Sequence, residues 1–212
     1  MTGQALTPSK VSMFLYPMRL TVLVIVYAVT GKLGLAMALD SPQITLIWAP
    51  SGIALACLLR WGRAYWPGVW LGAMVVSLWL GTPFWVAFAI ACGNTGEALI
   101  GVVLLRRAKL RLSLTRRRDV MYLLIFGALL PTTIAATVGV GVLKLAGITS
   151  TMTSMAWLGW WLGDACGVLL VAPFLLTMSV QEPNPDKRIL SQGYLILLAL
   201  TVISPCAFTP LV

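Results

Sequence analysis

The apolar residues of this chain fall into seven long runs, separated by short stretches rich in Gly, Pro and charged residues. An α-helix needs about 20 apolar residues to cross the hydrocarbon core of a bilayer. The second and third runs are short, close to the lower limit for a span. The pattern predicts seven transmembrane helices, at residues 20–39, 43–59, 64–80, 84–105, 120–143, 155–178 and 192–212.

Helix-breaking residues stand where the chain should turn between these spans. They are found at Asp40-Ser41-Pro42, Gly62, Gly81-Thr82-Pro83 and 182–185. The expected fold is therefore an all-α, polytopic bundle.

Composition supports a membrane protein and excludes a soluble domain. Hydrophobic residues make up 59% of the 212 residues and charged residues only 10%. The mean hydropathy is +0.94. A soluble fold of this size needs more polar surface to cover its core, whereas lipid solvates apolar side chains directly.

The positive charge is distributed over alternate loops. The net charge of +9 could suggest a nucleic-acid partner, but the basic cluster 106–118 is a short loop without interleaved aromatics, which argues against one. Thirteen of the 15 Lys and Arg residues lie in the N-terminal tail and in the loops after the second, fourth and sixth spans. Enrichment of Lys and Arg on the cytoplasmic side predicts a cytoplasmic N-terminus.

The domain boundaries follow from the same pattern. We expect a cytoplasmic tail at residues 1–19 and a membrane-embedded domain at 20–212. A signal peptide cleaved after Ala38 is a weaker alternative, since its n-region would be long and Lys32 would lie just before the cut. Seven crossings from an inside start end outside, so we expect a longer protein in which an eighth span returns the chain to the cytoplasm.

The residue types of the chain do not indicate a metal site or a cofactor site. The chain has no histidine, and its four cysteines stand far apart within apolar runs. This spacing fits neither a zinc site nor a disulfide framework, and it favours buried packing residues. We therefore expect no metal, no cofactor and no catalytic residue.

Three ionisable residues lie within predicted spans: Lys32, Glu97 and Asp164. Each costs at least about 2.5 kcal/mol on insertion scales, so each needs a partner or a function. At 1.5 Å per residue, Lys32 lies about 10 Å, Asp164 about 14 Å and Glu97 about 20 Å from the outer end of its span. Lys32 with Asp164 is thus the easier ion pair, which could either lock two helices together or form part of a ligand site.

The neighbours of both acids are unusually organised. Trp160 and Trp161 lie one turn before Asp164, and Asn94 accompanies Glu97. Small residues repeat every four positions beside Asp164, which permits close helix packing. These are Gly159, Gly163 and Gly167, with Gly93 and Gly101 in the corresponding places around Glu97.

The second span contains Pro50-Ser51-Gly52. Proline frees a carbonyl and glycine loosens the helix, so a kink or a break is expected about a third of the way in. Broken helices can expose backbone groups to ligands, although plain kinks are commoner.

Six strings in this order resemble the first family of bacterial membrane-associated sensor domains, over about residues 20–180. They are Gly31-Lys32-Leu33-Gly34-Leu35, 47–54 (Ile-Trp-Ala-Pro-Ser-Gly-Ile-Ala), 66–73 (Trp-Pro-Gly-Val-Trp-Leu-Gly-Ala), 93–99 (Gly-Asn-Thr-Gly-Glu-Ala-Leu), Arg117-Arg118-Asp119-Val120 and 160–167 (Trp-Trp-Leu-Gly-Asp-Ala-Cys-Gly). The resemblance implies an inner-membrane input module of about eight spans, ahead of a cytoplasmic histidine kinase, diguanylate cyclase or phosphodiesterase module. No motif of such an output module occurs in this chain.

The preferred interpretation is a sensory module without catalysis, which detects a small ligand or a membrane partner and signals to a cytoplasmic output domain in a two-component or cyclic di-GMP pathway. Its site would comprise Lys32, Asp164, Glu97, Asn94, Trp160 and Trp161, beside the broken second span. A small transporter or permease subunit is the alternative, because buried charges and broken helices also suit solute pathways. An intramembrane enzyme ranks third. Assembly as a homodimer is left open.

Overall fold

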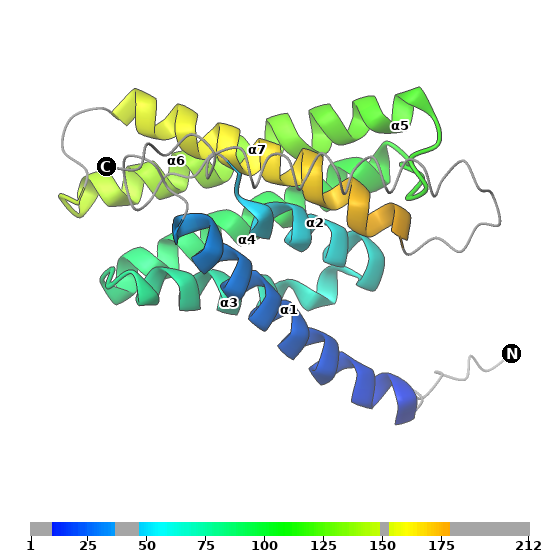
Figure 1. The fold of residues 1–212 in the computed structure, drawn as a ribbon, viewed down its shortest axis with the longest axis horizontal. Coiled ribbons are helices and arrows are strands. Elements are labelled where there is room, and N and C mark those ends of the chain that lie inside the picture. The colour runs from blue at the N-terminus through cyan, green and yellow to red at the C-terminus, as the bar shows by residue number, and fades with distance from the viewer. Residues whose placement is uncertain (1–9, 37–46, 149–152, 179–212) are drawn as a thin grey trace, which may run out of the picture.

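The computed structural model describes residues 10–36, 47–148 and 153–178, and within these ranges every regular element is helical. The elements are α1 (Lys10–Ala36), α2 (Ala49–Trp61), the short 3-10 helix η1 (Arg63–Tyr65), α3 (Trp66–Trp79), α4 (Phe84–Arg107), α5 (Arg117–Tyr122), the π-helical η2 (Leu123–Leu129), α6 (Leu130–Leu145) and α7 (Thr153–Met178) (Figure 1). The predicted all-α class is confirmed for this part of the chain.

Four helical segments are long and apolar enough to cross a membrane: Leu15–Ala36, Phe84–Arg107, Arg117–Leu145 and Ser154–Met178. The third of these runs without interruption through α5, η2 and α6. Its π-helical stretch ends at Leu129, two residues before Pro131. The seventh predicted helix, at 192–212, lies outside the described residues.

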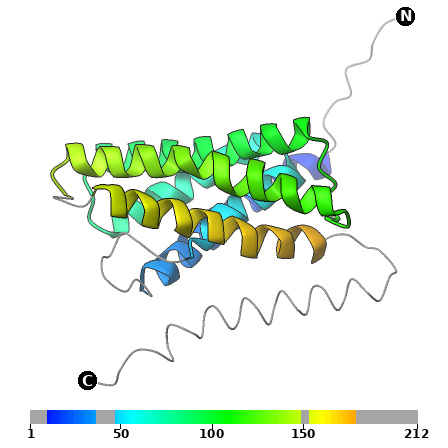
Figure 2. The same ribbon diagram turned by 90° about the horizontal axis from the view of Figure 1, so that it is seen from above.

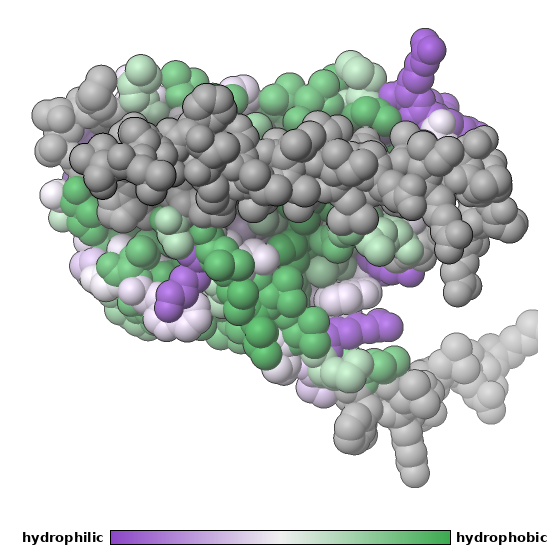
Figure 3. All heavy atoms as spheres, viewed as in Figure 1, coloured by the Kyte–Doolittle hydropathy of each residue, from purple (hydrophilic) through white to green (hydrophobic). Residues whose placement is uncertain are grey.

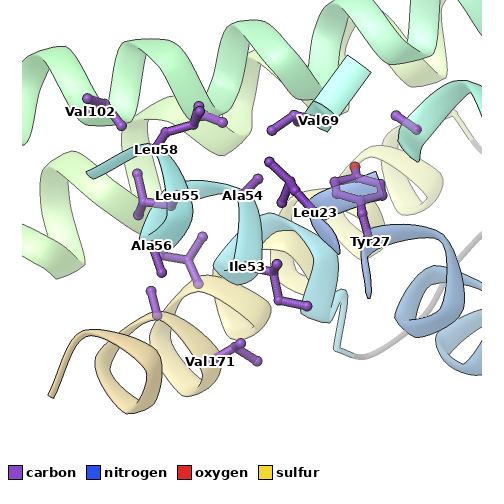
Figure 4. Close-up of a cluster of buried hydrophobic side chains, with 14 of the residues drawn as sticks. Leu23, Tyr27, Ile53, Ala54, Leu55, Ala56, Leu58, Val69, Val102 and Val171 are labelled. Carbon is purple, nitrogen blue, oxygen red and sulfur yellow. The ribbon is translucent and has the colours of Figure 1, made fainter. Parts of the chain in front are cut away.

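The short helix α2 occupies the centre of the bundle. Its 13 residues span about 20 Å, and it contacts α1, α4 and α7. Nine of the 13 are buried, which leaves little of this helix for lipid. Its apolar side chains meet those of the surrounding helices, as Figure 4 shows for Leu55, Leu58, Leu23, Val102 and Val171. The second predicted span is therefore a buried core helix rather than a lipid-facing one.

The connections between helices gather at two ends of the molecule (Figures 1 and 2). One end carries the links from α2 to α3 and from α4 to α5, with the cluster 106–118. Hydrophilic side chains project there, beside α5, whereas apolar surface covers much of the visible flank (Figure 3). The other end carries the link from α3 to α4. The alternation of basic and non-basic loops thus corresponds to two separate ends, called here the basic end and the opposite end.

Candidate functional site

The first turn of α2 is held against α7 by backbone contact. The Trp48 amide donates a hydrogen bond to the Gly163 carbonyl at 2.8 Å. A Cβ at Gly167 would overlap the Trp48 carbonyl oxygen, and a Cβ at Gly52 would overlap the Gly167 carbonyl. Gly163 and Gly167 both lie at this contact, whereas Gly159, one turn away, is half-buried. The glycines let the backbones of α2 and α7 touch.

Asp164 lies on α7 between these two glycines and is 0% exposed. The Ser51 hydroxyl donates a hydrogen bond to Asp164 Oδ1 at 2.8 Å. Asp164 Oδ2 has no hydrogen-bond partner among the described residues. Because Ser51 belongs to the first turn of α2, the carboxyl group also lies near the N-terminus of a helix, which carries a partial positive charge.

Glu97 and Asn94, on α4, extend this polar cluster. Glu97 is 3% exposed, and its carboxylate interacts with both Asp164 and Ser51. Asn94 donates from Nδ2 to the Tyr27 hydroxyl on α1 at 3.1 Å. Glu97 Oε2 and Asn94 Oδ1 are buried without a hydrogen-bond partner in the described part of the chain. The cluster therefore brings together α1, α2, α4 and α7.

A cavity of about 50 Å³ opens beside Asp164 and Asn94. Its walls come from α1, α3, α4, α6 and α7, together with Trp48 at the start of α2. Its lining is Leu35, Trp48, Ala73, Val76, Ser77, Leu80, Thr82, Ile90, Asn94, Leu143, Trp160, Gly163 and Asp164. Leu80 and Thr82 belong to the link from α3 to α4, so the cavity reaches from the buried acid toward the opposite end of the bundle.

Two tryptophans flank the cavity, and glycines make room for both. The Trp48 ring lies against Gly31 and Gly34 of α1. The Trp160 ring lies against Gly139 of α6, where a Cβ would come within 2.6 Å of the indole. Trp160 is also in polar contact with Asp164. Most of the strings singled out in the sequence thus converge on this one place.

The predicted pair of Lys32 with Asp164 is wrong. The Lys32 side chain is exposed, and its ammonium lies over the Trp79 ring, 4.7 Å from the centroid. Depth along the helix is similar for the two residues, but the Lys32 side chain is exposed and directed to Trp79 rather than into the polar cluster. Asp164 instead accepts a hydrogen bond from the Ser51 hydroxyl.

Two further expectations need correction. Trp161 does not line the cavity; its indole donates to the Leu129 carbonyl at the end of η2, at 3.0 Å. Within the described residues, which here begin at 47, Pro50, Ser51 and Gly52 do not interrupt a helix, because α2 begins at Ala49 and Pro50 lies in its first turn. Proline is tolerated there since the amide it lacks has no partner within the helix.

Sequence reasoning missed three residues of the site. Ser51 was considered only as part of a helix break, although serine near a helix start is a familiar sign of side-chain hydrogen bonding. Trp48 and Tyr27 gave no signal, because an aromatic residue within an apolar run has the same pattern whether it faces lipid or a cavity. No group of three His, Cys, Asp or Glu that could hold a metal ion occurs among the described residues.

The sequence matches the family model MASE1 over residues 18–212, which is most of its length. The chain belongs to the MASE1 family. MASE1 is a family of membrane-associated sensory domains, and membership of it is consistent with a sensory role. Neither a curated protein nor a solved structure matched this MASE1 chain in the comparisons.

Proposed function

We propose that this MASE1 domain is a multi-pass sensory module of the bacterial inner membrane, which detects a small ligand in the cavity beside Asp164. The observation that carries the proposal is a completely buried carboxyl group on the wall of a cavity, one oxygen of which has no hydrogen-bond partner in the part of the chain that the structure describes. Burying an unsatisfied charged group is costly, so a purely structural role would favour a fully paired acid or an apolar residue.

The route of ligand access is part of the proposal. We place the basic end in the cytoplasm, by the enrichment of Lys and Arg there, and the mouth of the cavity near Leu80 and Thr82 on the external side. Single-cysteine labelling in intact cells tests this orientation. A cysteine at Ser113, on a background without native cysteines, should be protected from an impermeant maleimide, and its labelling from outside would contradict the orientation.

Signal transmission would use the contact between α2 and α7. The two helices meet backbone to backbone at Gly52 and Gly167, so a small displacement of α7 by a ligand cannot be absorbed by side chains. The far end of α7, near Met178, lies at the basic end of the bundle (Figure 1). A ligand that binds one packing of α7 better than another would shift their populations, and the shift would reach a cytoplasmic kinase, diguanylate cyclase or phosphodiesterase.

Transport is the alternative function, and the core below the cavity argues against it. The inner part of the bundle is filled by leucines that are no more than 2% exposed: Leu55, Leu58, Leu105, Leu123 and Leu176. A solute pathway needs polar groups or water along its whole length. The polar cluster instead ends at these buried leucines.

The proposal is tested with a reporter. Residues 1–212 are fused through an added hydrophobic span to a diguanylate cyclase, and growth conditions that change the output of the wild-type fusion are identified. Asp164→Asn keeps the size and most of the hydrogen bonding of the side chain but removes the charge. We expect normal abundance in the membrane and an output that no longer responds, with a milder loss for Glu97→Gln. Normal regulation by a well-expressed Asp164→Asn fusion would contradict the proposal.

A further inference from the structure

We propose that the cavity binds a compact primary ammonium group, the charged end of a small amine. This inference rests on the proposed function, because it names the ligand class of the same cavity. Three features of the site carry it: a surplus of hydrogen-bond acceptors, two carboxyl groups with no cationic side chain in the described lining, and aromatic walls around a small space.

The polar cluster has more acceptors than donors. Asp164, Glu97 and Asn94 each have a buried side-chain oxygen with no hydrogen-bond partner among residues 10–36, 47–148 and 153–178. The local donors are already engaged: the Ser51 hydroxyl bonds Asp164 Oδ1, the Asn94 amide bonds the Tyr27 hydroxyl, and the Trp160 indole is in polar contact with Asp164. Asp164 and Asn94 belong to the cavity wall. A ligand that satisfies this wall must therefore bring N–H or O–H groups of its own.

The cluster holds two neighbouring carboxyl groups without a cationic side chain beside them among the described residues. The described lining of the cavity contains neither Lys nor Arg. Lys32 is directed to Trp79 instead. The first turn of α2 supplies only about half a positive charge. Even if one acid carries a proton, the remaining negative charge exceeds that of the helix terminus, and a cationic ligand would balance it.

The lining of the cavity distinguishes a primary ammonium group from a quaternary one. Trp48 and Trp160 line the cavity, and indole faces attract ammonium groups. The volume of about 50 Å³ holds a group of a few heavy atoms, since one water needs about 10–15 Å³ by the same measure. A quaternary ammonium would fit the aromatic walls but offers no N–H donor to Asp164 Oδ2 and Asn94 Oδ1. A primary ammonium offers three donors and meets both requirements.

The test uses the full chain in lipid nanodiscs, with methylammonium chloride as the probe. The midpoint of thermal unfolding is followed by tryptophan fluorescence, at constant ionic strength, against tetramethylammonium chloride and sodium chloride. We expect a saturable rise in the midpoint with methylammonium only. Asp164→Asn should weaken this binding at least about tenfold, because a charge-assisted hydrogen bond is lost. Asp119→Asn is the matched control, a fully buried acid away from the cavity, and should bind as the wild type does.

The wild-type measurement stands even if Asp164→Asn fails to fold. Equal stabilisation by tetramethylammonium, or by sodium, would overturn the assignment of a primary ammonium. Absence of any methylammonium effect would overturn it as well, while a reporter that still depends on Asp164 would leave the sensory proposal intact. Conversely, methylammonium binding that depends on Asp164, together with a reporter indifferent to Asp164→Asn, would support the ammonium site and contradict the sensory proposal.

Discussion

The first turn of α2 meets buried carboxylates, an amide and a cavity, whereas its last two turns are surrounded by closely packed apolar side chains. Leu58 and Leu59 lie in a continuous apolar cluster with Leu105, Leu123 and Leu176. Ser51, only two turns earlier, bonds a buried acid that has an unpartnered oxygen. A single short helix therefore joins a region built for packing to a region where polar groups remain unsatisfied. The difference suggests that stability resides at one end of α2 and ligand response at the other.

The largest expected effect comes from breaking the contact that joins the two regions. Gly167→Leu would force a side chain into the Trp48 carbonyl and push α2 away from α7. We expect a loss of at least about 3 kcal/mol in the free energy of unfolding, or failure to fold, measured as detergent-resistant folded protein. Gly141→Ala is the control, because nothing lies within 4 Å of its Cβ position. A Gly167→Leu protein as stable as the wild type would mean that the helices do not meet there.

Removing packing at the apolar end should cost stability but not response. Leu58 is 0% exposed, so Leu58→Ala leaves a cavity in the core and should lower the free energy of unfolding by about 2–5 kcal/mol. The output of the reporter fusion, divided by the amount of folded protein in the membrane, should still respond. Loss of response in the folded fraction would show that the two regions are not separable.

The two fully buried aspartates should respond in opposite directions. Asp164→Asn removes a charge from the cluster with Glu97 and keeps the bond from Ser51, so thermal stability should be retained or rise by about 1 kcal/mol. Asp119 lies in the first turn of α5 beside Arg117 and Arg118. Asp119→Asn should therefore lower stability by about 0.5–1 kcal/mol, through lost interaction with the helix terminus. A loss above about 2 kcal/mol for Asp164→Asn would identify Asp164 as a structural acid.

The smallest effect is expected at Lys32. Its ammonium lies over Trp79 at an exposed position, which is worth about 0.5–1 kcal/mol. Lys32→Gln should lower the unfolding free energy by no more than this. A buried ion pair with Asp164 would instead show a loss of about 3–5 kcal/mol, because the acid would remain without its partner. The measured value thus separates the cation–π contact from the ion pair.

The helices could be predicted from the sequence because apolar length and breaker residues report where the chain can cross lipid. The central position of α2 could not, since hydropathy shows that a side chain avoids water but not whether lipid or protein covers it. Asp164, Glu97 and Asn94 were found because polar residues are conspicuous in an apolar run. The partner of Asp164 was missed because depth along a helix says nothing of the rotation that turned Lys32 outward.

The most direct test of the ligand site measures the electrostatics of the cavity at Ser77, which lines it. A cysteine is placed at Ser77, without the native cysteines, and its reaction rates with aminoethyl and sulfonatoethyl methanethiosulfonate are compared. The ratio of cationic to anionic rate should fall about tenfold on introducing Asp164→Asn, because the carboxylate draws cations into the cavity. The same substitution should leave the ratio unchanged for a cysteine at Ser113, in the cluster 106–118 at the basic end. An unreactive Ser77 position, or a ratio indifferent to Asp164→Asn, would contradict an acidic cavity open to ligand.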